Sequence, residues 1–175
     1  KRPCNRDLRR SREPMASGTT LRPRVQAART RLAEGRQRLR ERHAQGAPGV
    51  QICNAWADLL DSVVLELFES ALVRLDQLGP KGMASQIALV PNGGYGRRDV
   101  APYSDVDLMI LYAPGARARV APLAERLFRD LYDVQLKVGH SLRSPREAIR
   151  ESRAEAKTFT SLVECRYLGG SVSLY

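Results

Sequence analysis

The sequence lacks an apolar run of about 18 residues, the minimum for a membrane-spanning helix. It also has few cysteines: Cys4, Cys53 and Cys165 are odd in number and lack the spacing of metal ligands. Such cysteines are typical of free thiols in a reducing compartment. The first residues are basic, but no apolar signal-peptide segment follows them. We therefore expect a cytoplasmic protein, whose native start lies elsewhere because the sequence opens on Lys1 rather than Met.

Aromatic residues are also scarce, at 6% of the chain, and none lies in the first 50 residues. Those residues hold 14 Lys and Arg against 4 Asp and Glu, a net charge of +10, whereas residues 51–175 hold 15 of each. A basic segment attracts nucleic acid or an acidic partner. Without aromatic side chains to stack on bases, nucleic-acid binding is not favoured. We interpret residues 1–24 as a disordered basic arm and residues 25–175 as the folded domain.

Hydrophobic periodicity predicts the elements of this domain. Apolar residues recur every three or four positions in the helical segments and form short runs in the strands. Ser144, Pro145 and Glu147 form a capping-box pattern that starts a further helix. We predict helices at 25–44, 52–78, 120–132, from 145, and at 157–168, and strands at 86–90, 105–112 and 134–138. This order is typical of an α+β fold with a small mixed β-sheet flanked by helices.

Two carboxylates open the second predicted strand, in the segment Ser104-Asp105-Val106-Asp107. Because residues two apart on a strand share a face, Asp105 and Asp107 should lie together, with Val106 pointing to the other side. Two like charges held this close repel each other, and a divalent cation relieves the repulsion. Hard oxygen ligands suit Mg²⁺, which normally completes its shell with water and substrate phosphates. We therefore predict that Asp105 and Asp107 are catalytic metal ligands.

A glycine-rich turn, Asn92-Gly93-Gly94-Tyr95-Gly96, follows the first predicted strand. Gly93 and Gly94 lack side chains, so backbone N–H groups there can approach phosphate oxygens closely. Arg97 can add a charged fork to the same phosphates. Ser104 completes the nucleotide-binding candidates, although its hydroxyl suits a hydrogen bond to local backbone better than nucleophilic attack. Together with the two carboxylates, this order of parts favours phosphoryl transfer from a nucleoside triphosphate.

The segments Gly93-Gly94-Tyr95-Gly96-Arg97 and Pro102-Tyr103-Ser104-Asp105-Val106-Asp107-Leu108 resemble the nucleotidyltransferase domain of the PII protein uridylyltransferases, a family of the DNA polymerase β-like superfamily. The resemblance extends to residues 136–143 and 162–169 and covers roughly residues 25–175. It implies a polymerase β-like nucleotidyltransferase core, Mg²⁺ held by Asp105 and Asp107, and transfer of UMP from UTP to a tyrosine of the PII signal protein, with a role in nitrogen regulation.

The sequence departs from the family in three ways. The superfamily often places a third carboxylate on the third strand, where this chain has Lys137. Asp133 is a substitute candidate, and a contact of Lys137 with phosphate is the alternative. Pro91-Asn92 interrupts the end of the first strand. The uridylyltransferases also have downstream phosphohydrolase and regulatory domains that this chain lacks, so it is an excised piece, a degenerate copy or a stand-alone enzyme. The alternatives are a protein adenylyltransferase and a catalytically weak nucleotide-binding module.

Three further side chains are expected near the site. His140 follows a glycine at a predicted strand end and lies either at the rim of the site or in a structural hydrogen bond. Tyr95 and Tyr103 are most simply residues that pack the loop, with base stacking by Tyr95 as the alternative.

Overall fold

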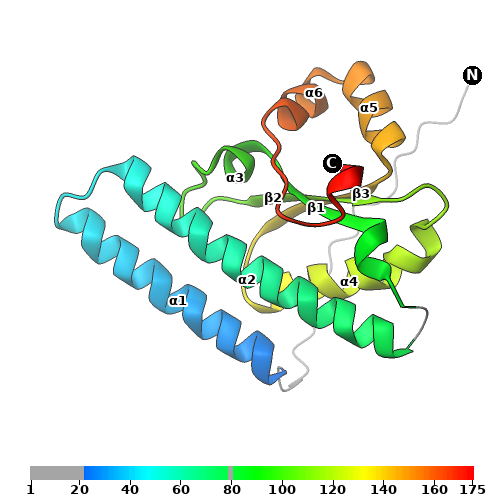
Figure 1. Ribbon diagram of the computed structural model, residues 1–175. Coiled ribbons are helices and arrows are strands. Elements are labelled where there is room, and N and C mark those ends of the chain that lie inside the picture. The colour runs from blue at the N-terminus through cyan, green and yellow to red at the C-terminus, as the bar shows by residue number, and fades with distance from the viewer. Residues whose placement is uncertain (1–21, 79–80) are drawn as a thin grey trace, which may run out of the picture.

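The sheet at the centre of the fold has four strands in the order β3-β2-β1-β4 (Figure 1). This computed structural model describes residues 22–78 and 81–175. The strands are β1 (Ile87–Pro91), β2 (Val106–Tyr112), β3 (Val138–Arg143) and β4 (Gly169–Gly170). Strand β1 runs antiparallel to β2 and β4, whereas β2 runs parallel to β3. The sheet is therefore mixed, and the predicted α+β class is confirmed.

Helices surround this sheet. They are α1 (Pro23–Ala44), α2 (Gly49–Leu78), α3 (Gly93–Arg97), α4 (Arg117–Asp133), α5 (Pro145–Ala154) and α6 (Ala156–Val163), with short 3₁₀ helices η1 (Met83–Gln86) and η2 (Val172–Leu174). No helix in the described ranges has both the length and the apolar character needed to cross a membrane. The basic arm proposed for residues 1–24 lies almost entirely outside the described residues, and α1 already begins at Pro23.

The helices cover the two faces of the sheet unequally (Figure 1). Helices α1, α2 and α4 form a large core with one face, which includes Leu89 and Ile110. Helices α5 and α6 cover a smaller apolar patch on the other face, around Val90 and Met109. Neighbouring residues of β1 and β2 thus alternate between the two cores, as the period of two in a strand requires. The thinner layer leaves Asp107, on the same face as Met109, accessible to solvent.

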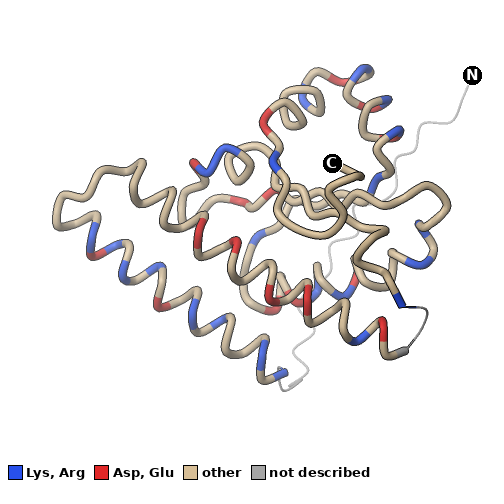
Figure 2. The backbone as a smooth tube through the Cα atoms, in the orientation of Figure 1, with Lys and Arg blue, Asp and Glu red and all other residues tan. Residues whose placement is uncertain are grey.

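Helices α1 and α2 form an antiparallel pair joined by residues 45–48. The buried stripe of α1 includes Val25, Leu32 and Gly35. A Cβ at Gly35 would lie 2.1 Å from Leu59 Cδ2, so the glycine lets the two helices approach closely. Arginines are spread along α1, and acidic residues are spread along the adjacent part of α2 (Figure 2). Arg31 pairs with Glu66 at 2.6 Å. The basic residues of α1 are therefore partly matched within the fold.

The start of α5 has the predicted capping box. The Glu147 N–H donates to Ser144 Oγ at 3.3 Å, and the Ser144 N–H donates to the Glu147 carboxylate at 2.7 Å. Each side chain thus satisfies a backbone donor that the first helical turn leaves free. The predicted helices at 25–44, 52–78 and 120–132 are also confirmed, and each begins two or three residues earlier than predicted.

The third strand was predicted at 134–138, and that placement is wrong. Val134 instead caps α4, and Gln135 adopts a left-handed backbone with φ of 64°. The Leu136 N–H then donates to the Leu131 carbonyl at 3.1 Å, and Val134 and Leu136 are buried. The alternating apolar residues therefore anchor a turn to the core, and β3 begins only at Val138.

The last helix was predicted to reach Leu168 and stop at Gly169, but α6 ends at Val163. The following residues run along the outer edge of β1: the Leu168 N–H donates to the Leu89 carbonyl at 3.0 Å, and the Ser171 N–H to the Ile87 carbonyl at 2.8 Å. The glycines that were interpreted as a helix stop form β4.

Candidate functional site

The glycine-rich segment forms one turn of helix rather than an irregular turn. Helix α3 starts directly after Asn92, which is buried and donates its backbone N–H to the Asp107 carbonyl at 2.9 Å. Gly93 adopts a left-handed backbone, with φ of 52°, which few other residues adopt. A Cβ at Gly93 would lie 3.3 Å from Asp107 Oδ2. The antiparallel pairing of β1 with β2 therefore brings the first predicted phosphate-binding glycine beside a predicted metal ligand.

Asp105 and Asp107 precede and follow Val106 in the sequence. Val106 is 1% exposed, whereas both aspartates are exposed. This alternation is expected at the start of a strand with one buried face. Partial burial raises the pKa of the Asp107 carboxyl, and repulsion from Asp105 raises it further, whereas the positive charge of Lys157 lowers it. The protein thus holds Asp107 where its negative charge is disfavoured without a nearby cation.

Gly139 lies on the other side of Asp107. Strands β2 and β3 pair Asp107 with Gly139, and a Cβ at Gly139 would lie 2.3 Å from Asp107 Oδ1. Any larger residue would occupy the position of the carboxylate. The Asp107 side chain is therefore held between two glycines, one from α3 and one from β3. Sequence reasoning missed the role of Gly139, because the third strand was placed too early to pair it with Asp107.

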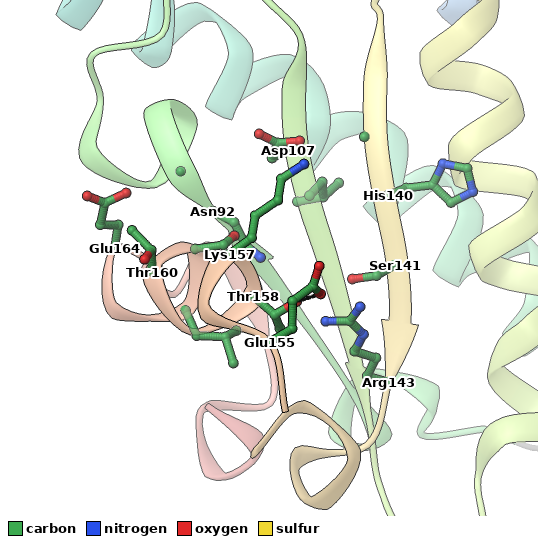
Figure 3. Close-up of a pocket in the computed structure, with 15 residues that line it drawn as sticks. Asn92, Asp107, His140, Ser141, Arg143, Glu155, Lys157, Thr158, Thr160 and Glu164 are labelled. Atoms are coloured by element: carbon green, nitrogen blue, oxygen red, sulfur yellow. Dashed lines mark hydrogen bonds between the residues drawn. The ribbon is translucent and has the colours of Figure 1, made fainter. Parts of the chain in front are cut away.

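A cavity of about 690 Å³ opens beside Asp107 (Figure 3). The ends of β1, β2 and β3 form one side, and α6 with the residue before it forms the other. The lining side chains are predominantly polar or charged: Asn92, Asp107, His140, Ser141, Arg143, Glu155, Lys157, Thr158, Thr160, Ser161 and Glu164. A cavity of this volume is in the range of small-molecule sites.

Arg97 and Ser104 do not line this cavity. The Arg97 guanidinium donates to the Asp99 carboxylate at 2.8 Å and also pairs with Glu164. These carboxylates raise the Arg97 pKa, the hydrogen bond to Asp99 having the largest effect. Ser104 is exposed, and its backbone N–H donates to the Ala101 carbonyl at 3.0 Å. Gly94 and the predicted metal ligand Asp105 are not part of the lining either, so Gly93 and Asp107 are the predicted site residues that contact the cavity.

The third strand offers no third carboxylate beside Asp107. On the face that Asp107 shares, β3 presents Gly139, then Ser141 and Arg143. Asp133 is the last residue of α4 rather than the start of a strand, and Lys137 precedes β3. Among residues 22–78 and 81–175, no three His, Cys, Asp or Glu side chains are grouped in a way that could hold a metal. A metal here therefore depends on two aspartates together with water and substrate oxygens.

His140 borders the cavity, but its ring points away from it towards α4 (Figure 3). The ring lies 4.2 Å from the Phe128 ring between centroids, and its Nδ1 is 3.0 Å from the Tyr132 hydroxyl. Tyr95 is 1% exposed beneath the Arg166 guanidinium, which excludes the base-stacking alternative in this structure. Tyr103 packs at the loop surface, where Arg40 donates to its hydroxyl.

Exposed and partly buried ion pairs anchor the end of α3 to α2. Arg98 adopts a left-handed backbone with φ of 66° and pairs with Asp58 and, at 3.1 Å, with Asp61. Arg166, from the segment beside β1, pairs with the same Asp61 at 2.5 Å. A non-glycine residue in this conformation is uncommon and persists when its surroundings determine it. The network positions α3, and with it Gly93, against the sheet.

Three features define a nucleotidyltransferase-like core: the mixed sheet, the glycine-rich helix α3 after β1, and the aspartates at the start of β2. Comparison with curated proteins agrees with this class, whereas no family model matches the sequence. The chain is 33% identical over 160 residues to the bifunctional uridylyltransferase/uridylyl-removing enzyme of Azospirillum brasilense, covering 91% of this chain and 17% of that protein. Proteins of the same name match from Rhodospirillum rubrum, at 32% over 145 residues, and Methylococcus capsulatus, at 33% over 152 residues. These matches cover 82% and 87% of this chain and 16% of each relative.

The chain is therefore similar, over most of its own length, to one segment of proteins named bifunctional uridylyltransferase/uridylyl-removing enzyme. It spans about one sixth of the length of the curated relatives it matches, with 17% of the Azospirillum brasilense protein aligned. The second activity in the name of these relatives, uridylyl removal, is a property of those much longer proteins.

Proposed function

We propose that this domain transfers a nucleoside monophosphate, UMP from UTP, to a protein hydroxyl, with a tyrosine of the PII signal protein as the acceptor. The observation that carries the proposal is the position of Asp107, held between Gly93 and Gly139 at the edge of a polar cavity and repelled by Asp105. Uridylyl transfer is an activity that the names of the relatives share. The choice of UTP and of PII as partners rests on the family alone.

The residues present fit Mg²⁺. Asp107 on β2 and Asp105, directly before this strand, carry the hard oxygen ligands that Mg²⁺ prefers, and the cavity beside Asp107 has room for water and phosphate oxygens. The raised pKa of Asp107 indicates a carboxylate in need of a neighbouring cation. When bound, the metal neutralises charge on the attacking and leaving oxygens. Asp105 and Asp107 would hold it, and the Gly93 backbone would leave space for the phosphates next to it.

The experiment compares the parent with Asp107→Asn and, as a control, Asp133→Asn on α4. Each protein is incubated with Mg²⁺, one labelled nucleotide (UTP, ATP, CTP or GTP) and PII protein, and the products are analysed by mass spectrometry. We expect uridylylated tyrosine with the parent and Asp133→Asn, and no transfer with Asp107→Asn. Without metal, Asp107→Asn should melt no lower than the parent, because the substitution removes a disfavoured charge.

Three results would contradict the proposal. If none of the four nucleotides, each tested with Mg²⁺, shifts the melting temperature of the parent, the domain does not bind a nucleotide in this site. If only adenylylated products form, the domain is an adenylyltransferase of the same superfamily. Binding without transfer to any acceptor would instead favour a regulatory module.

A further inference from the structure

Lys157 lies on the α6 side of the cavity, opposite the strands that carry the aspartates. Figure 3 shows its side chain extending across the cavity towards Asp107. Its charge acts on Asp107 there, lowering the pKa of that carboxyl against the larger effects of burial and Asp105. Within the described part of the chain, Lys157 forms no ion pair within 4.0 Å. The cavity thus contains an uncommitted ammonium group near the proposed metal ligands.

The other cations around the cavity already have partners. Arg143 pairs with Glu151 at 2.8 Å, and Arg97 is held by Asp99 and Glu164 outside the cavity lining. The cavity lining also includes the carboxylates of Glu155 and Glu164. Without a free cation such a lining would repel a triphosphate, since like charges at these distances cost free energy even in a partly hydrated site.

We propose that Lys157 binds a phosphate oxygen of the nucleoside triphosphate, in the role that the sequence suggested for Arg97 and, alternatively, for Lys137. An ammonium on a flexible four-carbon chain reaches a phosphate as a point charge, without the fixed geometry that a guanidinium requires. The hydroxyls of Thr158 and Ser161, which line the same side of the cavity, add neutral donors next to it. This inference rests on the proposed function and assigns α6 to the substrate site.

The test measures the dissociation constant of UTP, with excess Mg²⁺, for the parent, Lys157→Met and Lys157→Arg, at several salt concentrations. Lys157→Met keeps the length of the side chain and removes its charge. Lys81→Met is the matched control, since Lys81 is exposed and lies outside the cavity. Thermal melts without ligand establish that each variant is folded. Steady-state kinetics with the same proteins separate the effect on KM from that on kcat.

We expect Lys157→Met to weaken UTP binding by about ten-fold or more at low salt, as for the loss of a charge-assisted hydrogen bond. The difference from the parent should shrink as salt screens the lost contact, and Lys157→Arg should recover part of the affinity. KM should rise more than kcat falls. Lys81→Met should match the parent.

Three outcomes would overturn this role for Lys157. Equal affinity of Lys157→Met and the parent would mean that the lysine makes no contact with UTP. A loss of affinity that does not change with salt would point to a structural effect. Tighter binding by Lys157→Met would mean that the lysine competes with the metal for Asp107. A parent that binds none of the four nucleotides would instead refute the proposed function, and this role with it.

Discussion

Replacing Gly139 with Ala should separate the activity of the domain from its stability. The added Cβ would lie 2.3 Å from Asp107 Oδ1, whereas ordinary van der Waals contact begins at 3.4 Å. The carboxylate must therefore move by about 1 Å, and a misplacement of this size near the reacting atoms costs roughly 100-fold in rate. The obstacle is the end of a flexible side chain, so the backbone of β3 need not shift.

The free energy of unfolding should not fall in Gly139→Ala. Gly139 is not among the residues with positive φ, so alanine can adopt its backbone conformation. Substituting glycine at such a position typically stabilises by about 0.4–1 kcal/mol, because the unfolded chain loses freedom. Gly49→Ala is the control, since nothing lies within 4 Å of a Cβ there and its φ is not positive. The assay measures kcat/KM for UTP and PII, with chemical denaturation of the same samples.

We expect Gly139→Ala to lose about 100-fold in kcat/KM while unfolding no earlier than the parent. Gly49→Ala should keep the parent's kcat/KM. The reasoning fails if Gly139→Ala keeps the activity of the parent, because the position of Asp107 would then not matter. It also fails if the variant unfolds, because the strand would then need the glycine for its own packing.

Two further predictions concern stability. Gly96→Ala should lower the free energy of unfolding by about 1–3 kcal/mol. Its Cβ would lie 2.1 Å from the Glu164 carbonyl oxygen and 3.0 Å from the Pro91 carbonyl oxygen, and both are backbone atoms. An unchanged denaturation midpoint would contradict this prediction. The second prediction concerns Glu147, whose pKa is lowered from 4.5 to about 2. The cause is hydrogen bonding to its carboxylate from the Ser144 backbone N–H, the Tyr112 hydroxyl and the Ser144 hydroxyl. Because the carboxyl has a lower pKa in the folded state, its charge stabilises the fold at pH values above its pKa in the unfolded chain. This contribution is lost as the pH falls through the pKa of the folded state. Melting temperature should therefore drop more steeply from pH 4.5 to 2 in the parent than in Glu147→Gln, and parallel curves would exclude this account.

Much of the fold was predictable because local patterns agreed with tertiary packing. The alternation of Asp105, Val106 and Asp107 predicted a strand that starts with alternating exposed and buried residues, and β2 starts this way before both of its faces become buried. Helices α1 and α2 end where glycine and proline follow, and Ser144 with Glu147 forms the expected capping box. Each of these signals acts within a few residues, so no knowledge of distant contacts was needed.

The errors occurred where one pattern supports two structures. Val134 and Leu136 alternate as in a strand, but they are buried on a turn whose middle residue, Gln135, has a left-handed backbone. This error shifted β3 and put Lys137 in the position beside Asp107, where the structure has Gly139. Lys157 was missed for another reason: it reaches the cavity only because α6 packs across the ends of the strands, and no local signal in the sequence reports that contact.

The pairing of β4 with β1 has a consequence for how the domain is synthesised. Strand β1 lies between β2, which follows it closely in the chain, and the backbone of residues 166–171, which is translated much later. Until that segment has left the ribosome, the outer edge of β1 offers unpaired backbone groups to any other strand. Arg166, which closes both this edge and the ion pairs behind α3, arrives in the same stretch. Nascent chains stalled before it should therefore be the form of this domain most prone to aggregate.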